Sequence, residues 1–253
     1  MLGAGKQDRL GCPARVAVRA AVVLMGGLPI AGALVMVLGP SASASALSPA
    51  QAVRASISTG ARQASVHWVS SAVVSGVSTE LDTQAGGSSG WQTISESQGT
   101  TSAQLTIELV KGAAYMIGDA GGLYLQGLTQ APASAEAGKW ISVPSSSRVY
   151  PPAVAGLTVA STMQELQMSG AVKAVAAIEF QGRRDPGYQG KTKSSPGLPS
   201  ASETLYVSST GSHLPVKVLS DGSTTVFSQW GSAVNVTTPN GAVVLRSSWL
   251  RSG

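Results

Sequence analysis

Few side chains in this sequence could support the common catalytic mechanisms. The chain contains only two histidines, His67 and His213, whereas a catalytic zinc site usually takes three protein ligands, often histidines. No Gly-x-Ser-x-Gly nucleophile elbow occurs, although a serine, a histidine and an acid from distant segments could assemble a site. A serine hydrolase is therefore the third and least favoured interpretation, and we expect both histidines to be surface or strand-packing residues.

Other motifs with possible chemistry stand in unfavourable surroundings. Gly190-Lys191-Thr192 matches the end of a phosphate-binding loop, but the motif's first glycine would fall at Asp185. The sequence SSPGLP at 194–199 also prevents the helix on which such a loop depends. Glu80 and Asp82 would share a strand face, where paired carboxylates could cleave glycosides, but a solvated face is the simpler interpretation. Asn235-Val236-Thr237 fits a glycosylation site only in a host with that machinery.

Charged residues are scarce and unevenly placed. They make up 11% of the 253 residues, against 43% hydrophobic residues, which excludes a coiled coil and a highly charged disordered chain. The net charge of +5 comes largely from residues 1–46, so we expect no nucleic-acid binding. One predicted loop is basic and could contact anionic head groups or simply be soluble; its cations are Arg183, Arg184, Lys191 and Lys193.

The N-terminus has the layout of an export signal. A basic stretch precedes the apolar run Ala20–Leu38, and the small-residue tract Ser41–Ala46 follows it. Cleavage after Ala44 or Ala46 is favoured, although the apolar run could remain as a membrane anchor. In both cases residues 47–253 would form a domain outside the cytoplasm, preceded by a signal peptide or anchor at 1–46. Residues 47–253 contain no cysteine, which excludes disulfides and thiol chemistry there.

Short segments rich in Val, Thr and Ser predict a meandering antiparallel sheet from residue 64 onward. Apolar residues alternate clearly at Leu105, Ile107 and Leu109. The strands are expected at Val66–Val74, Ser78–Gln84, Trp91–Ser97, Ala103–Val110, Ala113–Ile117, Leu123–Gln126, Val175–Gln181, Thr204–Ser209, Pro215–Ser220, Thr224–Trp230 and Val243–Leu245.

Two segments have helical spacing of apolar residues. Ser48–Gln63 begins with a capping serine and a proline, and Leu157–Met168 repeats apolar residues at every third position. We expect a loop or short helix at Thr129–Gly138, an extended piece at Lys139–Pro144 and a mobile loop over Gly182–Ser202. The resulting fold class is α+β, a large antiparallel sheet with helices on one face.

Three stretches, at this order and spacing, resemble a known family. Gly138–Pro144 (GKWISVP), Glu203–Val218 (ETLYVSSTGSHLPVKV) and Phe227–Pro239 (FSQWGSAVNVTTP) are similar to segments of the LppX/LprG family of actinobacterial lipoproteins. The resemblance covers roughly Ser48–Pro239 and implies a LolA-like half-barrel with helices on its concave face. It departs from the family at Cys12, the only cysteine, which precedes the apolar run and so cannot be the acylated residue.

The resemblance implies a non-enzymatic carrier of a lipid or lipoglycan at the cell envelope, with acyl chains between sheet and helices. We expect a monomer with a hydrophobic ligand, contact with the membrane surface and no metal or cofactor, and an envelope protein is a candidate partner. The alternative is a structural or regulatory envelope protein that acts through a partner. Position alone gives these candidates for the cavity lining, each of which could equally be core: Ile107, Tyr115, Ile117, Leu123, Leu125, Met163 and Leu166.

Overall fold

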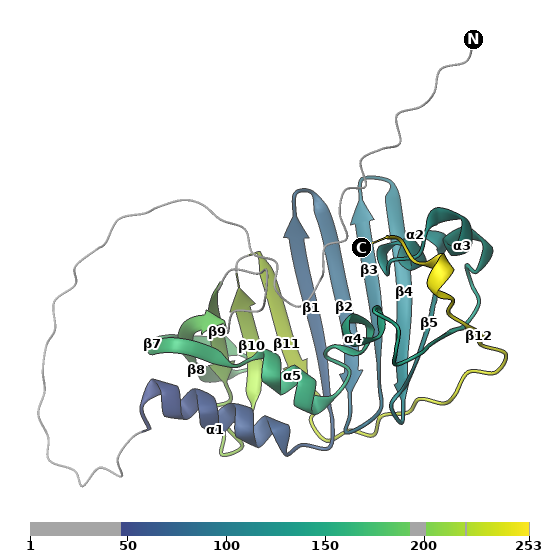
Figure 1. The fold of residues 1–253 in the computed structure, drawn as a ribbon. Coiled ribbons are helices and arrows are strands. Elements are labelled where there is room, and N and C mark those ends of the chain that lie inside the picture. Colours follow the sequence, from purple (N-terminus) through teal and green to yellow (C-terminus); the bar gives the residue numbers. More distant parts are fainter. Residues whose placement is uncertain (1–46, 193–200, 221, 253) are drawn as a thin grey trace, which may run out of the picture.

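A single open sheet of 12 strands dominates the computed structural model, which describes residues 47–192, 201–220 and 222–252 (Figure 1). The strand order is β12-β6-β5-β4-β3-β2-β1-β11-β10-β9-β8-β7. Neighbours are antiparallel except β12, which pairs in parallel with β6. The strands are β1 Val66–Val74, β2 Val77–Ala85, β3 Gly90–Gln98, β4 Thr101–Val110, β5 Ala113–Gly118, β6 Ile141–Val143, β7 Met168–Phe180, β8 Arg183–Thr192, β9 Ser202–Val207, β10 Pro215–Ser220, β11 Ser223–Ser228 and β12 Val243–Val244.

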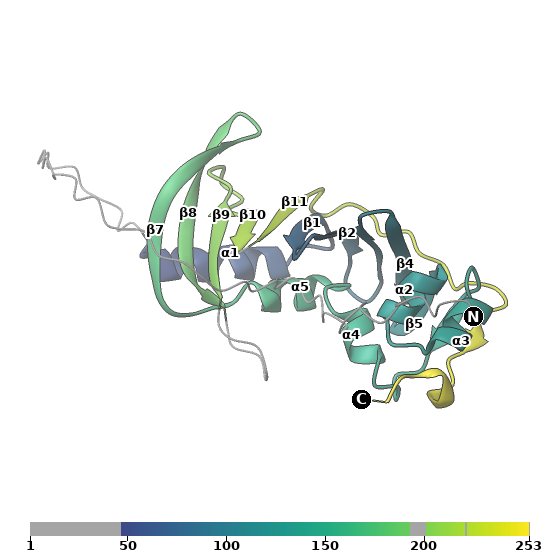
Figure 2. The ribbon, with the colours of Figure 1, turned by 90° about the horizontal axis from the view of Figure 1, so that it is seen from above.

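Five α-helices of the described residues cover one face of this sheet (Figure 2). They are α1 Pro49–Ala61, α2 Ala120–Leu125, α3 Gln130–Ala135, α4 Tyr150–Val154 and α5 Val159–Glu165. Helix α1 contacts α5 and the strands β7, β9 and β10, whereas α2 and α4 contact β4 and β5. The sheet is therefore covered by two separate groups of helices, one at each end.

The strand register defines the covered face, here called the inner face. Trp68 of β1 lies opposite Phe227 of β11 and Thr83 of β2, and the same row continues through Gln92 to Ile107. These five side chains are buried, while the alternate residues along each strand are mostly half-exposed on the outer face. The period-2 alternation of a strand thus places every second residue in the core.

The predicted α+β fold, with a large antiparallel sheet and helices on its concave face, is confirmed. Strand β1 has the predicted bounds, and the predicted helices at 48–63 and 157–168 correspond to α1 and α5. Ser48 begins α1 through a capping box: its backbone N–H donates to Gln51 Oε1 at 2.9 Å, and Gln51 N–H donates to Ser48 Oγ.

Two secondary-structure predictions were wrong. The segment Leu123–Gln126 was predicted as a strand, but it belongs to α2 and its C-terminal cap. Asp119 begins that helix, because its carboxylate accepts the N–H of Gly122 at 2.6 Å. The loop predicted over Gly182–Ser202 contains strand β8, paired with β7 and β9. Residues 193–200, including Lys193, and the predicted leader at 1–46 lie outside the described residues.

After β11 the chain runs past the ends of the central strands to the far edge of the sheet, where it forms β12 (Figure 1). Leu245, just after β12, is buried in the core beside α2–α4. A short 3-10 helix, Ser247–Trp249, follows. The C-terminal segment therefore completes the edge opposite β7.

Candidate functional site

The core on the inner face consists of two apolar clusters. One lies beneath α2–α4 and includes Ile107, Met116 and Leu123. The other lies beneath α1 and α5, and we call it the α1/α5 cluster. Its buried members are Val53, Val66, Trp68, Leu81, Ala85, Val159, Met163, Leu166, Leu205, Val207, Val218 and Phe227.

Helices α1 and α5 meet at a glycine. A Cβ added to Gly60 of α1 would lie only 2.5 Å from Met163 Sδ of α5 and 3.3 Å from the Trp230 ring. Real Cβ contacts are longer than this, so the absence of a side chain at Gly60 permits the close approach. The two helices therefore form one packed unit over the sheet, here called the helical cover.

A small internal space remains between α5 and the sheet. Its volume is about 20 Å³, enough for one water molecule and far too small for an acyl chain. The lining residues come from α5, β1, β9, β10 and β11, and they are Trp68, Thr162, Glu165, Leu166, Glu203, Val218, Thr225 and Phe227. An acyl chain could enter this space only if the helical cover moved away from the sheet.

This space has polar groups as well as apolar walls. The hydroxyl of Thr225 donates to Ser70 Oγ at 3.0 Å, and the hydroxyl of Thr162 is 2.9 Å from the carbonyl oxygen of Gly156. Trp68 is 1% exposed, and its Nε1 has no hydrogen-bond partner among the described residues. Buried indole N–H groups usually find a partner, and Trp68 is one of the residues that line the space.

The seven residues predicted to line a cavity are divided by the structure. Met163 and Leu166 belong to the α1/α5 cluster, and Leu166 also lines the internal space. Ile107 and Leu123 belong to the other cluster. The remaining three are half-buried, and their predicted role stays a prediction: Tyr115, Ile117 and Leu125.

Several lining residues were not predicted as site residues. Trp68, Val218 and Phe227 all lie in predicted strands, and Trp68 and Phe227 are direct cross-strand partners. The alternation of Val66, Trp68 and Ser70 in β1 was the available signal, because it marks these three as one face of a strand. The sequence could not indicate that α5 would lie over that face.

A serine, a histidine and an acid come together on the outer face. Ser228 Oγ lies 2.9 Å from His67 Nδ1, and Asp82 Oδ1 lies 2.7 Å from His67 Nε2. These side chains come from three neighbouring strands. None of them lines the internal space beneath α5. The two hydrogen bonds link the neighbouring strands β11, β1 and β2. The second histidine, His213, is exposed in a turn with a φ of +48°.

Two glutamates have perturbed acidity. Desolvation by burial raises the pKa of Glu96, on β3, and the pKa of Glu108, on β4. Glu108 points to the outer face and Glu96 to the inner face. They therefore do not form a pair of catalytic carboxylates.

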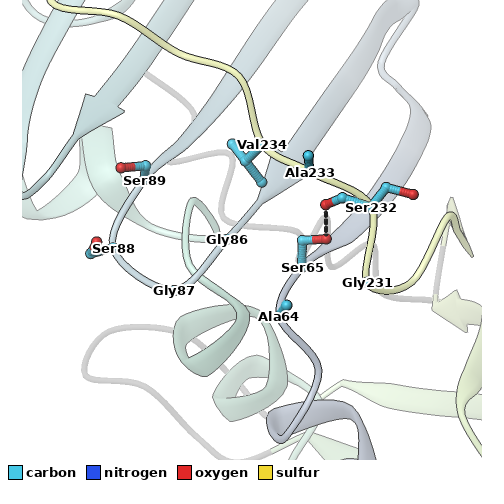
Figure 3. A pocket seen from close by; sticks show the side chains of 10 residues that line it. All are labelled: Ala64, Ser65, Gly86, Gly87, Ser88, Ser89, Gly231, Ser232, Ala233 and Val234. Atoms are coloured by element: carbon cyan, nitrogen blue, oxygen red, sulfur yellow. Dashed lines mark hydrogen bonds between the residues drawn. The ribbon is translucent and has the colours of Figure 1, made fainter.

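A second, more open space lies at the end of the sheet where β1 begins (Figure 3). Its volume is about 270 Å³, and small side chains and backbone line it. The Ser65 hydroxyl donates to the carbonyl oxygen of Ser232 across its wall. The lining residues are Ala64, Ser65, Gly86, Gly87, Ser88, Ser89, Gly231, Ser232, Ala233 and Val234. This lining includes no titratable side chain, so it offers neither an acid–base pair nor a metal ligand set.

Neither metal binding nor membrane spanning is indicated by the described part of the chain. No group of three or more His, Cys, Asp or Glu side chains there could hold a metal ion. No helix among those residues is long and apolar enough to cross a bilayer. Gly190-Lys191-Thr192 lies within strand β8, where it cannot form a phosphate-binding loop.

The open, curved sheet with helices on one face is similar to the fold of a mycobacterial protein of known structure. LprF from Mycobacterium bovis matches 77% of this chain and 97% of its own, with 15% identity and a TM-score of 0.51. The Mycobacterium tuberculosis lipoprotein LppX matches 75% of this chain and 98% of its own, with 15% identity and a TM-score of 0.40. The resemblance noted from sequence is thus confirmed at the level of the fold by LprF. No family model and no curated protein matches the sequence.

Proposed function

We propose that this chain is a non-enzymatic binding or carrier protein for a hydrophobic or amphipathic lipid, acting outside the cytoplasm at an actinobacterial-type cell envelope. The supporting observation is the space beneath α5, which lies on a largely apolar sheet face under a cover of two short helices. In this proposal residues 47–253 form the lipid-binding domain, and residues 1–46 direct export or remain as an anchor. The domain works as a monomer and meets the membrane surface to load or unload.

The driving force would be the burial of hydrocarbon. Each buried CH₂ contributes about 0.8 kcal/mol, so a chain of about 16 carbons has a gross driving force on the order of 13 kcal/mol. Part of this would offset the cost of ordering the ligand and separating the cover from the sheet. Lipid binding would therefore be a coupled process, in which the ligand stabilises an open conformation of α1 and α5.

A second candidate function is a structural or regulatory envelope protein that acts through a protein partner. One observation favours it: side chains fill the interior beneath α5 and leave only about 20 Å³. In that case the inner face is simply a hydrophobic core, and the functional surface lies elsewhere.

Mass spectrometry separates the two candidates. The full chain would be produced in an envelope-bearing host and purified without detergent, and native spectra would be followed by organic extraction. We expect one lipid bound per chain, which would also identify the ligand class. A chain that carries no lipid and takes up none of a panel of offered lipids would favour the partner-binding function. Fractionation of the host would test the proposed location.

A further inference from the structure

Three arginines lie at the end of the sheet that is formed by β6 and β12. We infer that this end docks on an anionic lipid bilayer through Arg148, Arg246 and Arg251, here called the arginine patch. The inference goes beyond the proposed lipid-binding function, because it concerns how the domain is held at a membrane and needs no ligand beneath α5. It also gives the membrane contact in that proposal a specific surface.

Charge is distributed unevenly along the sheet. Residues 66–110, which span β1–β4, contain no lysine or arginine and four acidic residues, Glu80, Asp82, Glu96 and Glu108. At the β12 end the acidic groups are engaged: Asp119 accepts the N–H of Gly122, and Glu136 lies 3.2 Å from Lys139 Nζ. Among the described residues no ion pair involves the arginine patch. Its positive charge is therefore available to an anionic partner.

Backbone contacts bring the arginine patch together around the loop that follows α2. The N–H of Arg251 donates to the carbonyl oxygen of Gly127 at 2.9 Å, and the residue after Arg148 packs against the same glycine. The 3-10 helix is held at this loop as well, since the carbonyl oxygen of Trp249 accepts the N–H of Thr129 at 2.7 Å. Figure 1 shows this short helix, in yellow, beside α2 and α3.

Two of the three arginines stack on aromatic rings. Arg246 Cζ lies 5.4 Å from the centroid of the Trp249 ring, and Arg251 Cζ lies 4.3 Å from that of Tyr124. A stacked guanidinium keeps N–H donors at its edge, where they suit the oxygens of a phosphate group. Trp and Tyr are also the aromatic residues enriched at the interface between bilayer and water. Val244, two residues before Arg246, adds an apolar side chain that is 61% exposed.

Other basic surfaces and other partners fit less well. In the hairpin of β7 and β8, Arg184 is the cross-strand partner of Glu179, and Arg183 Nε lies 3.9 Å from Asp185 Oδ1. The charge of that hairpin is offset locally, so an anionic surface would attract it weakly. An acidic protein is less favoured than a bilayer, because neither space described above is lined by the arginine patch and protein hot spots usually fill pockets.

An environment-sensitive fluorophore at two positions tests the inference. In a Cys12→Ser background, Ser248→Cys would carry an NBD group within the patch, and Ser78→Cys would carry one at the exposed start of β2. The full chain would meet vesicles of equal parts phosphatidylglycerol and phosphatidylcholine, or of phosphatidylcholine alone. Because the readout is local, it does not depend on whether residues 20–38 remain as an anchor.

We expect the emission at position 248 to rise only with phosphatidylglycerol, and the emission at position 78 to stay unchanged. The rise should diminish when NaCl is increased from about 0.1 M to about 1 M, because the Debye length falls from about 10 Å to about 3 Å.

Charge variants provide the matched comparison. Arg148→Gln with Arg246→Gln removes two exposed charges from the patch, and it should raise the phosphatidylglycerol concentration for half the response about 30-fold. Arg54→Gln with Lys173→Gln removes two exposed charges from α1 and β7 and should leave that concentration unchanged. Lysine at positions 148 and 246 keeps the charge and should keep most of the response.

The outcomes separate this inference from the proposed function. Equal responses to the two kinds of vesicle, or equal losses in the two glutamine pairs, would overturn it. A rise at position 78 in place of position 248 would overturn it too, because the bilayer would then contact another surface. A response to soluble polyphosphate but not to vesicles would replace the bilayer with a soluble anion. None of these results decides whether a lipid binds beneath α5, which native mass spectrometry tests separately.

Discussion

Replacing Gly60 with alanine would test whether α1 and α5 form one packed helical cover. The new methyl group would lie 2.5 Å from Met163 Sδ unless one of the helices or the Met163 side chain shifted. Met163 is 2% exposed and has little room to move. The substitution therefore adds volume to a filled contact.

The expected magnitude combines two opposing terms. Overpacking a close contact costs about 1–3 kcal/mol, and the better helix propensity of alanine returns about 1 kcal/mol. Gly60→Ala should thus lower the free energy of unfolding by about 0–2 kcal/mol. In a Met163→Ala background the clash with Sδ disappears and only the 3.3 Å approach to the Trp230 ring remains, so the same change should be stabilising by up to about 1 kcal/mol. The sign reversal corresponds to a coupling energy of about 1–3 kcal/mol.

Urea unfolding of the four chains in this double-mutant cycle would measure the coupling. Met163→Ala alone should cost about 2–5 kcal/mol, because it opens a cavity in the α1/α5 cluster. If Gly60→Ala has the same effect in both backgrounds, the contact between Gly60 and Met163 does not exist as described. The helical cover would then be looser than the structure indicates.

Two further substitutions and a change of pH have expected outcomes. Leu166→Phe should fill the internal space and reduce lipid uptake several-fold, measured by native mass spectrometry. His67→Ala should lower the free energy of unfolding, measured in urea, by about 1–2 kcal/mol, because two cross-strand hydrogen bonds are lost. If the protein is not an enzyme, a fluorophosphonate should not label Ser228. The raised pKa values of Glu96 and Glu108 mean that the folded state binds protons more tightly than the unfolded state, so their contribution to stability should grow as the pH falls through those values.

Matched controls make these outcomes decisive. Val73→Phe adds the same ring at a position that is 66% exposed, and it should leave lipid uptake unchanged. Equal uptake by both variants would contradict the location of the site. Labelling of Ser228 that His67→Ala abolishes would indicate a serine nucleophile after all. Glu96→Gln and Glu108→Gln should each reduce the change in the urea midpoint of unfolding between neutral pH and pH 5. An unaltered pH profile would show that these glutamates do not contribute to the pH dependence of stability.

The sequence predicted the elements whose local signals agree with their final environment. Strand β1 has its predicted bounds, and β10 does as well, because alternating apolar residues are followed by turn residues. The Gly182–Ser202 segment misled prediction because Pro186 and several cations weaken its strand signal. Its β8 strand is stabilised by pairing on both sides, with β7 and β9. Such pairing is non-local and cannot be seen in composition.

The candidate site was predictable only in part, for a related reason. Met163 and Leu166 were found through helical spacing, and both lie in the α1/α5 cluster. Trp68 and Phe227 were missed as lining residues because they are far apart in sequence and meet through strand pairing. The site also needs α5 to lie over these residues. That position involves the contact between Gly60 of α1 and Met163 of α5, which links two segments far apart in sequence.

The division of the core into two clusters has a consequence for how the molecule moves. The clusters meet at Ile94 of β3, a partly buried residue that packs against both. Separating α1 and α5 from the sheet would expose one cluster and leave the packing beneath α2–α4 in place. The two ends of the molecule would then behave as distinct cooperative units, with amide protons beneath α1 and α5 exchanging sooner than those beneath α2–α4. The α1/α5 end could open repeatedly while the packing beneath α2–α4 keeps the rest of the sheet folded.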